Sequence, residues 1–218
     1  MKDQITAIVL AGGESSRMGQ DKALLNLGKN TLLTQICLVA SKCASQTYVV
    51  TPWIEKYQDV IPASCQLIEE QLVLNSTSNT PLIGFFQGIK LVKTEWVLLL
   101  ACDLPHLSSS QVKQWSATLA TVLPTQIAFL PRNRKGWEPL CGFYRHSCQS
   151  LLEKYISNGG RSFQSWLAKY PVQELVISDR TCLFNCNTPE DWQMFNSKSS
   201  SSPIDQSSTL NNVLERSN

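Results

Sequence analysis

The chain has 218 residues, enough for one substantial hydrophobic core, and its 19 basic and 17 acidic residues give a net charge of +2. This near balance offers no electrostatic basis for binding nucleic acid or an anionic membrane. The first apolar run, residues 5–10, is too short for a secretory signal or a membrane span, so we expect a soluble cytoplasmic protein.

The first half of the chain alternates between strand and helix patterns. Residues 5–10 form a continuous apolar run that is typical of a fully buried strand. Residues 31–44 place apolar side chains at helical spacing, and the β-branched run at 47–51 predicts a second strand. A short strand is expected at 65–69, and Pro81 suits the first turn of the next helix.

The second half continues this alternation. Residues 95–101 are the strongest strand pattern, continuously apolar like a central parallel strand that is covered on both faces. Ser108 begins a capping-box pattern that predicts a helix. The remaining expected elements are strands at 127–130 and 140–144, a helix from Ser147 to Ile156, a helix near 162–169, a strand at 174–177 and a last helix that begins at Thr188.

This series predicts an α/β fold: a single Rossmann-like, three-layer domain with a mostly parallel sheet and right-handed crossovers. We assign residues 1–195 to this domain. Residues 196–218 are rich in Ser and Asn with few apolar residues, which predicts a disordered tail. Ligands in such folds bind at the carboxyl ends of strands, so the candidate segments are 11–22, the segment after Ala101 and the region after Thr51.

Eight cysteines and only two histidines rule out a recognisable zinc spacing, because none of the cysteines forms a C-x-x-C pair. Most of the cysteines lie in apolar runs, where cysteine behaves as a small hydrophobic residue. In a reducing cytoplasm all eight are expected to be reduced core thiols.

The loop after the first strand contains Gly12, Gly13, Arg17 and Lys22. Backbone N–H groups of a glycine turn point outward together, and nearby cations balance phosphate charge. The dinucleotide-binding pattern G-x-G-x-x-G is absent, and so is the P-loop pattern that requires Gly-Lys-Ser/Thr. On spacing alone, the loop is either a polyphosphate grip or a tight glycine turn with two solvated cations.

Asp103 follows the strongest predicted strand, where a carboxylate is rigidly presented at the sheet edge. Mg²⁺ typically uses one or two carboxylates together with phosphate oxygens and waters. From the residues alone, Asp103 is equally well interpreted as a metal ligand or as a turn residue that ends the strand. His106, three residues later, is interpreted as a loop residue rather than a general base.

Four motifs together resemble the molybdenum cofactor guanylyltransferase family of the nucleotidyltransferase superfamily. They span residues 5–192 and comprise Leu10-Ala-Gly-Gly with Arg17-Met-Gly and Asp21-Lys22, Pro81-Leu-x-Gly84, Cys102-Asp-Leu-Pro105, and Asn185-x-Asn-Thr-Pro-Glu-Asp191. The related cytidylyltransferases tend to have Leu-Ala-Ala-Gly, so the double glycine Gly12-Gly13 favours the guanylyl branch. The resemblance also implies a fold of the nucleotide-diphospho-sugar transferase type.

The resemblance implies transfer of GMP from GTP to molybdopterin or its molybdenum-loaded form, which releases pyrophosphate and gives a guanine dinucleotide cofactor. The implied cofactor is Mg²⁺. The implied partners are GTP and molybdopterin as substrates. Transient contact with cofactor-inserting proteins or molybdoenzymes is also implied, and neither nucleic acid nor a membrane is expected as a partner. By the same resemblance the catalytic residues are Arg17, Lys22 and Asp103, of which Asp103 is the metal ligand; the nucleotide-binding residues are Leu10, Ala11, Gly12, Gly13, Lys22, Glu70 and Asp103; and the acceptor-binding residues are Asn185 and Asn187.

Three positions depart from the family pattern. Glu70 stands where the family often has Asp, Thr51 where it frequently has Asn, and Thr80 where a glycine usually precedes Pro81. These departures concern base and ribose contacts more than phosphate handling. Two alternatives therefore stay open: a molybdopterin cytidylyltransferase or related nucleotidyltransferase, and a catalytically inactive nucleotide-binding regulatory protein.

Overall fold

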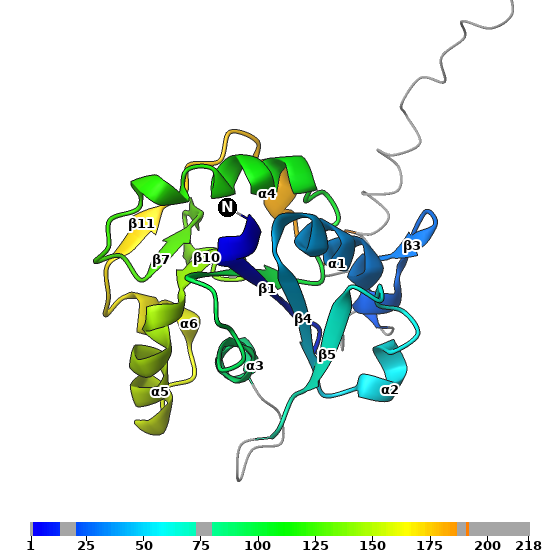
Figure 1. Ribbon diagram of the computed structural model, residues 1–218, viewed down its shortest axis with the longest axis horizontal. Helices are drawn as coiled ribbons and strands as arrows, with labels where there is room; N and C mark the ends of the chain where they lie inside the picture. The colour runs from blue at the N-terminus through cyan, green and yellow to red at the C-terminus, as the bar shows by residue number, and fades with distance from the viewer. Residues whose placement is uncertain (1, 14–20, 73–79, 187–190, 192–218) are drawn as a thin grey trace, which may run out of the picture.

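The protein is a three-layer α/β structure in which helices cover both faces of a central sheet (Figure 1). The computed structural model describes residues 2–13, 21–72, 80–186 and 191. The predicted tail at 196–218 and the helix start at Thr188 lie outside the described residues. The expected Rossmann-like fold class is confirmed.

The described sheet has seven strands, and β10 (Cys141–Arg145) is antiparallel to both of its neighbours, β6 (Trp96–Ala101) and β7 (Ala128–Leu130). The other described pairings of this sheet are parallel. In spatial order the strands are β11 (Val172–Glu174), β7 (Ala128–Leu130), β10 (Cys141–Arg145), β6 (Trp96–Ala101), β1 (Ile5–Leu10), β4 (Gln46–Thr51) and β5 (Cys65–Glu69).

Helices α1 (Leu32–Cys43) and α4 (Ser109–Ser116) cover one face of the sheet, and α3 (Pro81–Ile89), α5 (Gln149–Ser157) and α6 (Phe163–Leu167) cover the other (Figure 1). Each face buries its own apolar cluster, as expected of a sheet covered on both sides. The smaller elements are α2 (Ile54–Tyr57), the hairpins β2–β3 (Asn26–Leu27, Asn30–Thr31) and β8–β9 (Arg132–Asn133, Gly136–Trp137), and the 3₁₀ turns η1 (Lys2–Gln4), η2 (Lys22–Leu24), η3 (Leu119–Thr121), η4 (His146–Cys148) and η5 (Arg180–Leu183).

The helix starts follow their local sequence signals. The Thr31 hydroxyl accepts a hydrogen bond from Thr34 N at the start of α1, and Pro81 occupies the first turn of α3. Both bonds of the capping box between Ser108 and Gln111 are present at α4. The predictions for Pro81 and for the capping box at Ser108 are confirmed, and α1 lies within the helix predicted at 31–44.

Two predicted boundaries are wrong. Ser147 does not cap a helix, because the backbone first tightens into η4 and α5 then begins at Gln149 without a side-chain cap. The last strand is Val172–Glu174 rather than 174–177, because its partner β7 is only three residues long. Leu175 and Ile177 are buried in the core, so their alternation reflects packing rather than strand pairing.

None of the eight cysteines forms a disulfide, and all except Cys65 and Cys102 are buried. Cys182 and Cys186 are both fully buried thiols. Within the described residues, no helix combines the length and the apolar character that crossing a membrane requires.

Gly142 lets the antiparallel strand β10 pass close to β7. A Cβ at this position would lie 2.7 Å from Leu130 Cδ2 and 2.9 Å from the Phe129 carbonyl oxygen. We therefore expect Gly142→Ala to lower the free energy of unfolding by about 1–3 kcal/mol through overpacking, measured by urea denaturation. The exposed control Lys154→Ala should stay within about 0.5 kcal/mol of wild type. An unchanged Gly142→Ala variant would show that the two strands can separate at no cost.

Candidate active site

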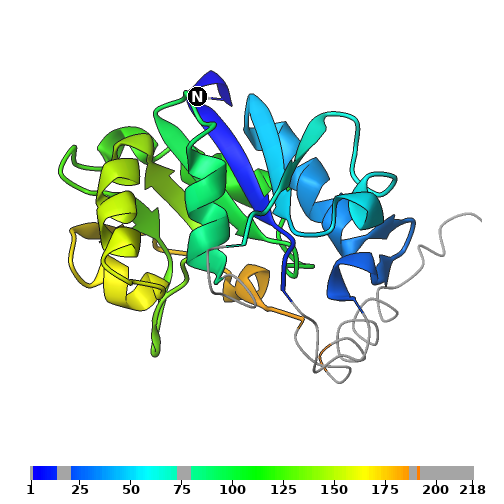
Figure 2. The same ribbon diagram turned by 90° about the horizontal axis from the view of Figure 1, so that it is seen from below.

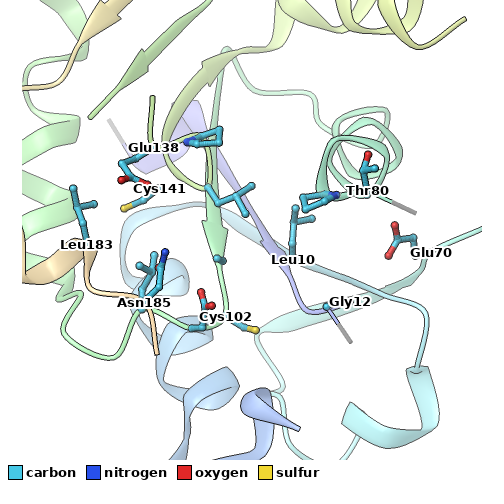
Figure 3. Close-up of a pocket in the computed structure, with 17 residues that line it drawn as sticks. Leu10, Gly12, Glu70, Thr80, Cys102, Glu138, Cys141, Leu183 and Asn185 are labelled. Atoms are coloured by element: carbon cyan, nitrogen blue, oxygen red, sulfur yellow. The ribbon is translucent and has the colours of Figure 1, made fainter. Parts of the chain in front are cut away.

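The candidate site lies at the carboxyl edge of the sheet, where three neighbouring parallel strands end at one level. Leu10 at the end of β1 pairs with Val50 on β4 and with Ala101 on β6. Figure 2 shows the segment around η5 lying at the edge where β1 ends. A cavity of about 350 Å³ opens here, lined by Leu10, Gly12, Gly13, Glu70, Thr80, Pro81, Gly84, Ala101, Cys102, Asp103, Leu104, Glu138, Pro139, Leu140, Cys141, Leu183 and Asn185 (Figure 3).

Thr51 holds the start of the glycine loop against the end of β4. Its hydroxyl donates to the Ala11 carbonyl oxygen over 2.8 Å and accepts from Trp53 N over 3.1 Å. The Ala11 N–H in turn donates to the Val50 carbonyl oxygen over 3.0 Å. Ala11 is buried and is not among the lining residues, whereas Leu10, Gly12 and Gly13 line the cavity. The side chain of Thr51, one of the departures from the family pattern, therefore holds the loop in place.

Glu70 lies at one end of the cavity with its carboxylate against two glycines (Figure 3). A Cβ on Gly12 would lie 2.8 Å from Glu70 Oε2, and a Cβ on Gly84 would lie 3.2 Å from Glu70 Oε1. The Glu70 N–H donates to the Thr51 carbonyl oxygen over 2.8 Å, which fixes the backbone of this residue. The absence of a Cβ at both glycines leaves the room that the carboxylate occupies, and a Cβ at Gly12 would make it shift.

Asp21 positions the turn that carries Lys22. One Asp21 carboxylate oxygen accepts from Ala23 N over 3.0 Å and the other from the Tyr57 hydroxyl over 2.7 Å, while Lys56 forms an ion pair with it. Burial of Tyr57, reinforced by this hydrogen bond to Asp21, raises the pKa of the phenol well above its usual range. The two residues of the Asp-Lys motif therefore have different roles. Asp21 anchors η2, and Lys22 is directed toward the cavity edge.

Asp103 and Lys22 face each other, with Lys22 Nζ 3.9 Å from Asp103 Oδ2 and both side chains less than one-fifth exposed. Burial raises the pKa of Asp103 above its ordinary value of 3.8, while the Lys22 charge and a backbone hydrogen bond oppose the shift. The Cys186 N–H donates to the Asp103 carbonyl oxygen over 3.1 Å, which fastens the segment of Asn185 to this point. A buried carboxylate beside a cation is suited to polyphosphate and metal handling.

One wall of the cavity, Glu138–Cys141, was missed from sequence. Because β10 is antiparallel, the residues that precede it lie at the same edge as the residues that follow β6, and the Ala101 N–H donates to the Leu140 carbonyl oxygen over 2.8 Å. The pattern at 140–144 predicted the strand but carried no signal of its direction. Burial raises the pKa of Glu138, opposed by a hydrogen bond from Asn133 and by the Arg180 charge.

The predicted site residues Arg17 and Asn187 lie outside the described residues. The described part of the chain has no group of three or more His, Cys, Asp or Glu side chains that could hold a metal. Asp103 alone fits a Mg²⁺ ion of the kind that takes one or two carboxylates and completes its shell with phosphate oxygens and waters. His106 packs against the Phe184 ring, with ring centroids 6.0 Å apart, so its placement agrees with a loop residue.

A mostly parallel sheet with a glycine turn, a lysine and a largely buried carboxylate at its carboxyl edge is typical of α/β proteins that bind nucleotides there. Residues 7–174 match the family described as "MobA-like NTP transferase domain", and the chain belongs to this family.

The chain is 52% identical over 189 residues to the "Probable molybdenum cofactor guanylyltransferase" of Trichormus variabilis, covering 87% of this chain and 89% of the relative. It is 38% identical to the protein of the same name from Synechococcus elongatus, covering 86% and 95%. Among solved structures, it resembles the Archaeoglobus fulgidus "Molybdopterin-guanine dinucleotide biosynthesis protein A" with a TM-score of 0.73, 20% identity, and coverage of 90% and 100%. The last similarity supports the fold alone.

The Asp103 carboxylate, which is less than one-fifth exposed, leads to a prediction about stability. A carboxyl pKa that is higher in the folded state than in the unfolded state costs folding free energy once the pH rises through the two values. We expect Asp103→Asn to unfold with a higher free energy than wild type at pH 8, and the difference to shrink toward pH 4. Urea denaturation at both pH values measures this, with the exposed Asp59→Asn as the control. A variant less stable than wild type at pH 8 would contradict the burial cost.

Proposed function

We propose that this chain transfers GMP from GTP to molybdopterin, releasing pyrophosphate and forming molybdopterin guanine dinucleotide. The observation that carries the proposal is the Lys22–Asp103 pair at the carboxyl edge of β1 and β6, where Asp103 lines a cavity that also presents Gly12 and Gly13. The names of the relatives support the same activity, and family membership supports nucleotidyl transfer.

In the proposed reaction, a terminal phosphate oxygen of the acceptor attacks the α-phosphorus of GTP. A new P–O bond forms, the bond from the α-phosphorus to the bridging oxygen breaks, and pyrophosphate leaves with that electron pair. No enzyme nucleophile is needed, so positioning and charge neutralisation supply the rate. Lys22 stabilises the negative charge that develops on the transferred and leaving phosphates. Arg17 would assist at the same phosphates.

Mg²⁺, when bound, would neutralise phosphate oxygens, and Asp103 would hold it. The Asp103 carboxylate must be ionised to bind the cation, and burial makes ionisation harder by raising its pKa. The bound ion would lower the pKa of Asp103 again, because a second positive charge beside Lys22 favours the ionised carboxylate. The affinity of the protein for Mg²⁺ should therefore fall as the pH is lowered through this raised pKa.

Glu70 is the proposed acceptor of hydrogen bonds from guanine. The N1–H and 2-amino groups of guanine present two neighbouring donors, whereas the corresponding edge of cytosine includes an acceptor nitrogen that a carboxylate repels. The buried Thr80 hydroxyl lines the same end of the cavity and has no hydrogen-bond partner in the described part of the protein. A polar atom of the bound nucleotide would satisfy it. Leu10 and Pro81 supply apolar contacts there.

Wild-type protein incubated with GTP, Mg²⁺ and molybdopterin, with or without molybdenum, should yield pyrophosphate and the dinucleotide. Lys22→Ala should lower kcat by about 10²–10³, the usual cost of losing a charge-stabilising donor. Chromatography of the product and a coupled pyrophosphate assay measure both. Product from CTP but not GTP would identify a cytidylyltransferase, and GTP binding without turnover would identify an inactive regulatory protein.

Gly12→Ala should displace the Glu70 carboxylate, because the new Cβ would lie 2.8 Å from its Oε2 atom. In Gly12→Ala we expect KM for GTP to rise about tenfold, equivalent to about 1.4 kcal/mol, and the preference for GTP over ATP to fall. In Gly13→Ala the loss of this preference should be smaller. Gly13 is the matched comparison because its Cβ would meet no atom within 4 Å. Equal losses of base preference in the two variants would contradict the contact between Gly12 and Glu70.

A further inference from the structure

Glu138 is a third carboxylate of the cavity, beside Glu70 at the nucleotide end and Asp103 at the phosphate centre, and the proposed reaction gives it no role. Figure 3 places it at the opposite end of the cavity from Glu70, on the side of Leu183 and Asn185. It comes from the segment before β10, whereas Glu70 follows β5. The cavity therefore presents one carboxylate at each end, with Asp103 also in its lining.

The backbone around Glu138 is fixed on both sides. Its N–H donates to the Pro131 carbonyl oxygen over 2.8 Å, and its own carbonyl oxygen accepts from Cys141 N over 3.4 Å. The Tyr144 hydroxyl donates to the Pro139 carbonyl oxygen over 2.8 Å, which secures the next residue to β10. The side chain is thus presented from a rigid strand start, which is where a binding group keeps its geometry.

The orientation of the carboxylate is also set. The Asn133 side-chain N–H donates to Glu138 Oε1, and the Asn133 side-chain oxygen Oδ1 in turn accepts from Lys135 N over 2.6 Å. A carboxylate has about four acceptor positions, so this one bond leaves Oε2 and a lone pair of Oε1 for a ligand. In the described part of the chain, no cation lies within ion-pair distance of Glu138. A half-buried carboxylate without a close cation gains most from a ligand that brings donors.

We propose that Glu138 is the specificity-determining residue for the acceptor, and that it accepts hydrogen bonds from the N3–H and 2-amino groups of a pterin ring. This inference rests on the proposed function. The 2-amino-6-oxo edge of guanine and the 2-amino-4-oxo edge of a pterin present the same two adjacent donors. Glu70 and Glu138 would each read that edge, one on the nucleotide and one on the acceptor.

The surroundings of Glu138 suit a flat heterocycle. Pro139, Leu140 and Leu183 give this end of the cavity apolar walls, and apolar walls with a few convergent polar groups are typical of small-molecule sites. Asn185, which the motif resemblance assigned to the acceptor, lines the same end. The arrangement places the acceptor's ring away from Glu70 and leaves the centre of the cavity for phosphates.

The same contact would also discriminate against ring systems that lack the 2-amino group. In a 2,4-dioxopteridine the 2-amino donor is replaced by a carbonyl acceptor, which would face the Glu138 carboxylate and leave both groups unpaired. Sites built to hydrogen-bond a substrate group discriminate strongly against analogues that lack it. Wild-type turnover should therefore be inhibited at lower concentration by the free 2-amino-4-oxopteridine than by the 2,4-dioxo compound.

The test is steady-state kinetics of Glu138→Gln, which keeps the side-chain shape and can keep the Asn133 bond but exchanges one acceptor oxygen for a donor. KM for molybdopterin should rise about tenfold to a hundredfold, the usual worth of a hydrogen bond to a charged group, while KM for GTP stays within about twofold. The preference for the 2-amino inhibitor should disappear. Glu174→Gln removes an exposed carboxylate of β11 that does not line this cavity, and it should change none of these values.

The outcomes separate this inference from the proposed function. If wild type makes no dinucleotide, the proposed function fails and takes the inference with it. If wild type is active but Glu138→Gln keeps the acceptor KM and the inhibitor preference, the inference alone is overturned. If both KM values and the melting temperature change together, Glu138 is structural and the inference is likewise overturned. Glu138→Asp, which keeps the charge on a shorter side chain, should retain part of the preference for the 2-amino inhibitor.

Discussion

The site depends on the in-register parallel pairing of β1 with β4 on one side and β6 on the other. Leu10 pairs with Val50 and with Ala101, so the chain leaves three neighbouring strands at the same height. Hydrogen bonds then continue past the strand ends, from Thr51 to Ala11 and from Ala101 to Leu140. A slip of one residue in either pairing would turn the side chains to the opposite face and separate the glycine loop from Asp103.

Much of this could be predicted from sequence, because the signals are local. The continuous apolar runs at 5–10 and 96–101 need no partner to be recognised as buried strands, and the caps at Thr31 and Ser108 are short-range hydrogen bonds. The motif resemblance identified the family, and Leu10, Gly12, Gly13, Glu70, Asp103 and Asn185 all line one cavity.

The rest depends on tertiary pairing that a single sequence does not encode locally. Nothing in residues 140–144 reveals that this strand runs antiparallel, and that direction alone brings Glu138 to the site. The β8–β9 hairpin, which supplies Asn133, is two residues per strand and too short for a periodic pattern. The misplaced final strand has the same origin, since the length of β7 decides where pairing stops.

Several polar groups that line the cavity lower the free energy of unfolding, because they are buried without full compensation. Burial raises the pKa of Asp103 and of Glu138, and Thr80 keeps a buried hydroxyl without a partner in the described part of the chain. Sites that retain such groups are typically ones in which a ligand supplies the missing partners. Gly12 and Gly84 lie beside these groups, and their lack of a Cβ leaves room for the Glu70 carboxylate.

The central claim is that a nucleotide end at Glu70 and an acceptor end at Glu138 share one cavity whose lining includes Asp103. The most direct test is a crystal structure with a non-hydrolysable GTP analogue and Mn²⁺ in place of Mg²⁺, located by its anomalous signal. We expect the guanine edge on the Glu70 carboxylate and the metal on Asp103. Guanine bound against Glu138, or a metal with no contact to Asp103, would contradict it.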